Sequence, residues 1–172
     1  MNFTANYKDD VRNRKDKAMR RTDREIKNYE EILDVLNRAD TIRLCMHDNP
    51  FPYVVPLSFG FEDCDGQVCI YIHGAAEGLK HTLMDKNSNV CVEASIFHKY
   101  VETKMGLTTR YESVIGFGTA EVIYGEEAIK GLDLICSHCG YHGYTYDTSG
   151  LSRMRMYKIT LSSITGKRQL DY

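Results

Sequence analysis

The chain has 172 residues, 42% of them hydrophobic, and a formal net charge of -2 at pH 7. At this length one domain can bury roughly two thirds of the surface that the unfolded chain exposes. The nearly balanced charge argues against nucleic acid or an anionic membrane as a partner that electrostatics alone would recruit. A small molecule is therefore the expected ligand.

Two further features of the sequence predict a cytoplasmic protein. No run reaches the roughly 18 apolar residues that a membrane-spanning helix needs, and residues 1–30 are charged rather than hydrophobic. The six cysteines lie in a long chain without an export signal, so we expect free thiols rather than disulfides. Cys45, Cys69 and Cys91 lie in apolar runs, where cysteine commonly packs as a small hydrophobic side chain.

The helical segments follow from the spacing of apolar residues. Residues 1–20 are polar and lack an apolar period, so we expect an N-terminal arm before a single domain over 21–172. Apolar residues recur at helical spacing over 28–39, and acidic residues near the start of this segment suit the helix dipole. Two further helices are expected over 77–86 and 126–140.

The predicted strands alternate polar and apolar residues and are rich in β-branched and aromatic side chains. Asp65-Gly66 is a turn signal, and the polar residues 98–110 are expected to form a crossing outside the strands. Short strands with few helices between them predict a mainly β fold, a closed or half-closed barrel, rather than alternating βαβ units. The expected strands are 41–46, 53–61, 67–74, 90–97, 111–124 and 153–166.

Pro56 lies inside one of these strands, 53–61. Because proline removes a donor from the ladder, it marks either a plain edge strand or an opening where backbone groups meet a ligand. Only a tight turn separates this strand from the one over 67–74, so the two are expected to be adjacent.

A candidate anion site follows the strand that ends at His73 and Gly74. Gly78, Leu79 and Lys80 begin the next expected helix, and the free backbone amides of a helix start suit a phosphate, as does the lysine. A solvated helix face with one lysine would have the same sequence. Both interpretations stay open on these residues alone.

The cluster Cys136-Ser137-His138-Cys139-Gly140-Tyr141-His142 carries two thiols and two imidazoles. Such groups ligate zinc, but zinc sites commonly use two separated pairs, whereas here all four ligands would come from one short segment. Cys136 and Cys139 also form a CxxC pair, without the βαβ context of thioredoxin-like proteins. We expect no metal here and keep zinc binding and thiol redox chemistry as alternatives.

Several sequence blocks, taken in order, resemble the nitroimidazole-resistance subgroup of the pyridoxamine 5'-phosphate oxidase-like proteins, which are flavin-binding split barrels. The resemblance runs from about Met19 to Arg168. It implies a six-stranded split β-barrel with peripheral helices that binds FMN as a homodimer, with the flavin sites at the subunit interface. The blocks are MRRTDREI (19–26), YVVPLSFGF (53–61), IYIHGAAEGLK (70–80), YESVIGFGTAEV (111–122) and ITGK (164–167).

The same resemblance implies the roles of individual residues. His73 would either donate a proton to the substrate or only hydrogen-bond the phosphate or the barrel wall. Ser113 would lie near the cofactor, and Lys167 would either approach the partner's site or cap the barrel. The implied cofactor contacts are Val55, Pro56, Leu57 and Ser58 along the flavin ring, and His73, Gly74, Leu79 and Lys80 at the phosphate.

The function favoured by the sequence is an FMN-dependent oxidoreductase that reduces a small, electron-poor substrate such as a 5-nitroimidazole. A flavin-binding or storage module without reductase activity is the alternative from another class. Haem-binding relatives of the barrel make His73, His138 and His142 candidate axial ligands. The only basic residues near the C-terminus are Lys167 and Arg168, which argues against pyridoxamine-phosphate oxidase activity itself. A Gly-rich dinucleotide motif is lacking.

Overall fold

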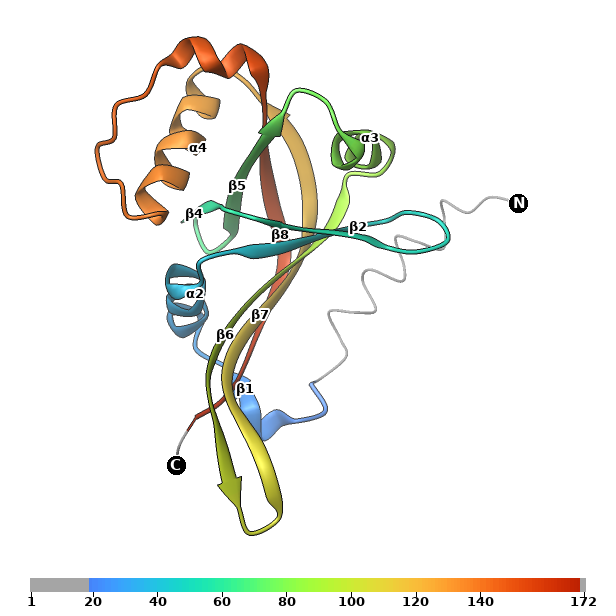
Figure 1. Ribbon diagram of the computed structural model, residues 1–172, viewed down its shortest axis with the longest axis vertical. Helices are drawn as coiled ribbons and strands as arrows, with labels where there is room; N and C mark the ends of the chain where they lie inside the picture. The colour runs from blue at the N-terminus through green and yellow to red at the C-terminus, as the bar shows by residue number, and fades with distance from the viewer. Residues whose placement is uncertain (1–18, 171–172) are drawn as a thin grey trace.

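The computed structural model describes residues 19–170, and its main feature is one long, curved antiparallel sheet with helices at its rim (Figure 1). The strands are β1 (Glu25–Ile26), β2 (Ile42–Met46), β3 (Tyr53–Leu57), β4 (Gly60–Asp63), β5 (Val68–Ala75), β6 (Asn89–Thr103), β7 (Gly106–Ile123) and β8 (Met154–Gln169). The helices are α2 (Tyr29–Arg38), α3 (Leu79–Lys86) and α4 (Gly125–His138), with 3-10 turns η1 (Thr22–Arg24) and η2 (Thr148–Arg153).

The sheet runs in the order β3-β2-β6-β7-β8-β5-β4, with β1 paired to β8. Its two end strands, β3 and β4, follow each other in the chain, so the sheet curls towards closure but keeps two edges. The expected mainly β split barrel is confirmed. The described residues form eight strands rather than six, because β1 adds a short pair and the run 53–61 divides into β3 and β4.

The division of the run 53–61 has a packing cause. Phe59 is completely buried, and an ideal Cβ on Gly60 would overlap with the backbone of Leu134 in α4. The chain therefore turns into the core and passes against the helix before it resumes as a strand. Of the two strands that the run 53–61 forms, β4 pairs with β5 and β3 pairs with β2. The expected adjacency of the whole run with 67–74 is therefore wrong for its β3 half.

The prediction that residues 98–110 form a crossing outside the strands is wrong as well. β6 and β7 pair without interruption as far as Thr103 and Gly106, with one register shift between Phe97 and Lys99. The hairpin extends beyond the body of the barrel (Figure 1). Because most of its outer half is exposed on both faces, its sequence lacks the alternation that marks a half-buried strand.

Local interactions fix the start of α2 and the predicted turn at Asp65-Gly66. The Asn28 side chain accepts a hydrogen bond from the amide of Glu30 at 2.9 Å and so caps α2, which buries Val35 and Leu36 against the sheet. Asp65 and Gly66 have φ values of 55° and 83°, which is the positive-φ geometry of a tight hairpin turn between β4 and β5.

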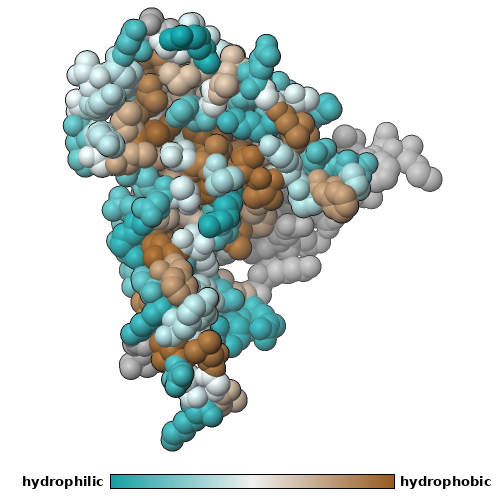
Figure 2. Space-filling model, in the orientation of Figure 1, coloured by the Kyte–Doolittle hydropathy of each residue, from teal (hydrophilic) through white to brown (hydrophobic). Residues whose placement is uncertain are grey.

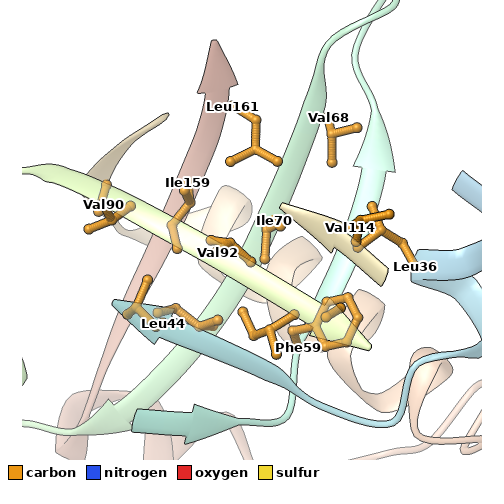
Figure 3. Packing of buried hydrophobic residues seen from close by; sticks show 14 of the residues in the cluster. Leu36, Leu44, Phe59, Val68, Ile70, Val90, Val92, Val114, Ile159 and Leu161 are labelled. Carbon is orange, nitrogen blue, oxygen red and sulfur yellow. The ribbon is translucent and has the colours of Figure 1, made fainter. Parts of the chain in front are cut away.

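Two apolar clusters lie on opposite faces of the sheet. The larger fills the barrel and includes Leu44, Phe59, Ile70 and Ile159 (Figure 3). The smaller lies beneath α4 and includes Tyr71, Leu132 and Met156. Between residues 19 and 170, no helix is long and apolar enough to cross a membrane.

Candidate functional site

The end of β5 and the start of α3 form a corner in which Lys80 lies against Gly74. An ideal Cβ on Gly74 would overlap with the terminal atoms Nζ and Cε of Lys80, so only glycine leaves room for the ammonium there. Lys80 is partly buried, burial lowers its pKa, and it has no acidic partner in the described part of the chain. An unpaired and partly desolvated cation is well placed to bind an anion.

The backbone at the same corner adds further donors. Gly78 caps α3 without a side-chain hydrogen bond, and its carbonyl accepts from the amides of His81 and Thr82 at 3.1 and 3.3 Å. The amides of Leu79 and Lys80 come first in the helix and so have no intrahelical acceptor. Together with the positive end of the helix dipole, they favour a negatively charged ligand next to Nζ.

His73 lies beside this corner, on the other face of the strand. Its cross-strand partner is Met156, which packs beneath α4 with Tyr71, whereas Gly74 points to the side of Lys80. Burial lowers the pKa of His73, and the charge of Lys80 lowers it further. The imidazole is therefore neutral at neutral pH when no anion is bound.

His81 follows Lys80 in α3 and is 3% exposed. Its Nδ1 lies 3.0 Å from the hydroxyl of Tyr157, and the two rings are stacked with centroids 5.5 Å apart. The guanidinium of Arg155 lies 5.4 Å from the Tyr157 ring centroid and pairs with Asp85 of α3. Sequence reasoning missed these groups, because Tyr157 is 76 residues away from His81 and lies in a strand without any motif.

The segment 55–58 lies on and just after the edge strand β3. Pro56 is opposite Arg43 of β2, and the other edge of β3 has no strand partner among the residues described. The predicted position of Pro56 at a sheet edge is confirmed. The side chains of Val55 and Leu57 pack against the core, while Pro56 and Ser58 are exposed on the outside. A ligand along this edge would therefore meet backbone groups and the outward side chains.

Ser113 and Lys167 are direct partners across β7 and β8, and the Ser113 hydroxyl lies 3.5 Å from the Lys167 carbonyl. They lie far from the corner at Lys80. Ten residues of β7 separate Ser113 from Ile123, whose partner Met156 is opposite His73, and this corresponds to roughly 33 Å of extended chain. One protomer therefore does not bring the two groups of predicted site residues together.

The cysteine and histidine cluster at the end of α4 serves packing in this structure. Nε2 of His138 lies 2.8 Å from the carbonyl oxygen of Ala39, and its ring centroid is 4.2 Å from that of Phe59. Cys139 is exposed, and burial raises the pKa of Cys136. Across residues 19–170, no three side chains of His, Cys, Asp or Glu come together as a metal site.

Solved structures share this fold. A candidate 5-nitroimidazole antibiotic resistance protein from Bacteroides thetaiotaomicron has 30% sequence identity and a TM-score of 0.74, and the match covers 83% of this chain and 85% of that one. A flavocytochrome from Azotobacter vinelandii matches at 16% identity and a TM-score of 0.72, over 90% of this chain and 73% of that one. An FAD-binding protein from Mesorhizobium loti matches at 18% identity and a TM-score of 0.63, and the match covers 86% of this chain and 98% of that one.

The sequence comparison points to the same group. No curated protein matches the chain. The family model described as pyridoxamine 5'-phosphate oxidase matches residues 28–168, which include the Lys80 corner, the β3 edge and the Ser113–Lys167 pair. The resemblance to the nitroimidazole-resistance subgroup is confirmed by the Bacteroides structure. The chain belongs to the pyridoxamine 5'-phosphate oxidase-like family of split-barrel proteins.

Proposed function

We propose that the protein binds FMN and passes two electrons from the reduced flavin to a small, flat, electron-poor acceptor such as a 5-nitroimidazole. The observation that carries this proposal is the Lys80 ammonium, which lies against Gly74 at the start of α3 and has no acidic partner within residues 19–170. Flavin binding is the named property of a solved relative, the FAD-binding protein from Mesorhizobium loti, and nitroimidazole resistance is named for the Bacteroides one.

The donors at the corner fit a terminal phosphate. The phosphate of FMN is a monoester with close to two negative charges and three free oxygens at neutral pH. Each phosphate of FAD has one ester and one anhydride linkage, and therefore two free oxygens and one charge. A single ammonium, two helix amides and the helix dipole converge at Lys80. This concentration of donors on one position supports FMN over FAD.

The rest of the site supplies position and protons. When bound, the flavin supplies the hydride chemistry. The outer edge of β3, which no strand of the described chain pairs with, offers backbone groups and the exposed faces of Pro56 and Ser58 to a flat ring. His73 would deliver a proton to the acceptor. A phosphate next to Lys80 offsets the charge that lowers the His73 pKa, and so moves this pKa back towards its ordinary value.

We propose further that the protein is a homodimer with the flavin sites at the subunit interface. Ser113 and Lys167 lie roughly 33 Å along the sheet from His73, so both groups can serve one flavin only if they come from different protomers. The outer face of the sheet carries Val54 and Ile115, which are 47% and 41% exposed. Figure 2 shows apolar side chains gathered on one face of the molecule.

The test compares Lys80→Ala with His73→Ala. Lys80→Ala should weaken FMN binding, measured by quenching of flavin fluorescence, by at least tenfold, the typical loss for a hydrogen bond to a charged group. His73→Ala should bind FMN within about threefold of wild type and slow the anaerobic reoxidation of reduced flavin by a nitroimidazole. Lys86→Ala, at the exposed far end of α3, is the matched control.

Each outcome decides between functions. Equal effects of Lys80→Ala and His73→Ala on FMN affinity would overturn the assignment of their roles. Flavin that is bound but not reoxidised by a nitroimidazole would assign the protein to the binding or storage class. A purified protein that shows no flavin absorbance and takes up no added FMN would overturn the proposal as a whole.

A further inference from the structure

The buried ring of His81 has one nitrogen in use and one without a partner. Nδ1 lies 3.0 Å from the hydroxyl of Tyr157. Nε2 is buried and has no hydrogen-bond partner in the part of the chain that the structure describes. Burying a polar atom without a hydrogen-bond partner is unfavourable, so such an atom is a candidate to pair with a bound ligand.

The ring turns its Nε2 edge towards the corner at Lys80. Its Cε1 atom lies 3.3 Å from the place of an ideal Cβ on Gly74, and its Cδ2 atom lies 3.7 Å from that on Gly78. These two carbons are the ones bonded to Nε2, so Nε2 faces the turn between the two glycines. The ring also interacts with the carbonyl of Ala75 in this turn, without hydrogen-bond geometry at Nε2.

The Tyr157 hydroxyl decides which ring nitrogen carries the proton. Burial raises the pKa of Tyr157 to about 12, so the hydroxyl keeps its proton. Its hydrogen has no acceptor other than Nδ1 among residues 19–170. Burial and the charge of Lys80 lower the pKa of His81, which keeps the ring neutral. A neutral imidazole that accepts at Nδ1 carries its proton on Nε2 and is a donor towards the turn.

We propose that His81 donates a hydrogen bond from Nε2 to the phosphate of the flavin, beside Nζ of Lys80, and that Tyr157 is the positioning residue that holds this tautomer. The inference rests on the proposed function, because it takes FMN as the ligand. A phosphomonoester has three free oxygens, and Lys80, the α3 amides and His81 give each of them a donor. Asp85 and Arg155 support the arrangement from behind the Tyr157 ring.

The experiment compares FMN with riboflavin, which has the same ring and no phosphate. Dissociation constants of the purified protein are measured by fluorescence quenching. His81→Leu should weaken FMN binding by about tenfold or more and change riboflavin binding by less than about twofold. His81→Gln, which keeps a donor at similar reach, should recover most of the affinity. Tyr157→Phe should weaken FMN binding by a smaller factor, again without an effect on riboflavin.

Matched controls and a second readout separate the outcomes. Tyr124→Phe and His142→Gln change exposed residues of the same types and should bind both ligands like wild type. The phosphorus-31 resonance of bound FMN should shift in His81→Gln and Tyr157→Phe, which decides the question even where His81→Leu fails to fold. Equal losses for FMN and riboflavin, or no loss and no shift, would overturn the role of His81. Absence of FMN binding by wild type would instead overturn the proposed function.

Discussion

The ammonium of Lys80 occupies the space that a Cβ on Gly74 would fill. Gly74 at the end of β5 thus leaves the space that the side chain of Lys80, at the start of α3, fills. The glycine therefore determines where the charge lies. The nearest obstacle for a larger residue is the far end of the flexible Lys80 side chain, and the next is Cε1 of His81 at 3.3 Å, which needs to move by only a few tenths of an ångström. The fold can therefore adapt to a substitution, whereas the location of the charge cannot.

Gly74→Ala should displace Nζ of Lys80 and leave the stability of the protein nearly unchanged. We expect FMN affinity to fall by about tenfold or more, as for the loss of a hydrogen bond to a charged group, with a melting temperature within a few degrees of wild type. Gly150→Ala is the control, because its added Cβ would meet only Met154 at an ordinary 3.6 Å. Wild-type FMN affinity in Gly74→Ala would show that the phosphate does not depend on Lys80 in this position.

Glu112 should give the protein an acid-dependent part of its stability. The residue is 4% exposed. Its Oε2 atom accepts a hydrogen bond from Nη1 of Arg38 at 2.8 Å and lies 3.1 Å from Nε2 of His98. Burial alone would raise the pKa of Glu112, but the hydrogen bonds from Arg38 and His98 outweigh it and hold the pKa below 4.5. Because the pKa is lowered on folding, the stabilisation is fully present above the pKa that Glu112 has in the unfolded chain. It is lost as the pH falls through the lower pKa of Glu112 in the folded protein.

Glu112→Gln should therefore lower the free energy of unfolding by about 2 kcal/mol near neutral pH, measured by urea denaturation. The difference from wild type should shrink as the pH falls below the ordinary pKa of a glutamate and disappear once it has passed the lower pKa of Glu112 in the folded protein, because the wild-type carboxyl is then protonated as well. Glu102→Gln changes an exposed acid on β6 and should leave the free energy of unfolding unchanged at every pH. A difference that does not depend on pH would contradict the ion-pair assignment.

The cysteines should react with an alkylating reagent in an order set by exposure and pKa. Cys139 is exposed and should react first, whereas Cys69 is 2% exposed and should react only after unfolding. Burial, together with the neighbouring thiol of Cys69, raises the pKa of Cys64 to about 12, so it should react slowly. Mass spectrometry of labelled peptides checks this order, with the protein in urea as the control. A Cys136–Cys139 disulfide in the purified protein would favour the redox interpretation of this pair.

Features that depend on neighbouring residues could be predicted from the sequence. The Asp65-Gly66 turn requires only positive φ at adjacent positions, and Pro56 had to lie at an edge because it lacks a donor. The corner at Gly74 and Lys80 was predictable for the same reason. It consists of a strand end and the helix start that follows, so its parts are brought together by local chain geometry.

The features that were missed depend on tertiary contacts. The run 53–61 divides because the backbone of α4 approaches Gly60, and no pattern within the run indicates this. Most of the hairpin over 98–110 is exposed on both faces, so the apolar period that marks a half-buried strand is absent there. His81 and Tyr157 meet through the pairing of β5 with β8, which a single sequence does not reveal.

The outer face of the sheet bears on the oligomeric state. A row of cross-strand partners runs across this face, from Pro56 through Arg43, Glu93 and Ile115 to Thr165. Ile115 lies in the middle of the row and is 41% exposed, so a second copy of the chain could bury it. Stable interfaces bury about 800 Å² on each partner, and a charge at the centre of such an area is strongly unfavourable.

Ile115→Arg should therefore convert a dimer into a monomer of 19.7 kDa, measured by light scattering coupled to size-exclusion chromatography. It should also weaken FMN binding, because Ser113 and Lys167 would no longer face the corner at Lys80 of a partner. Ile129→Arg is the matched control: its isoleucine is 37% exposed and lies on α4, so the dimer should persist. A monomeric wild type that binds FMN with undiminished affinity at nanomolar protein concentration would contradict the shared site, since the whole flavin would then be held by one protomer.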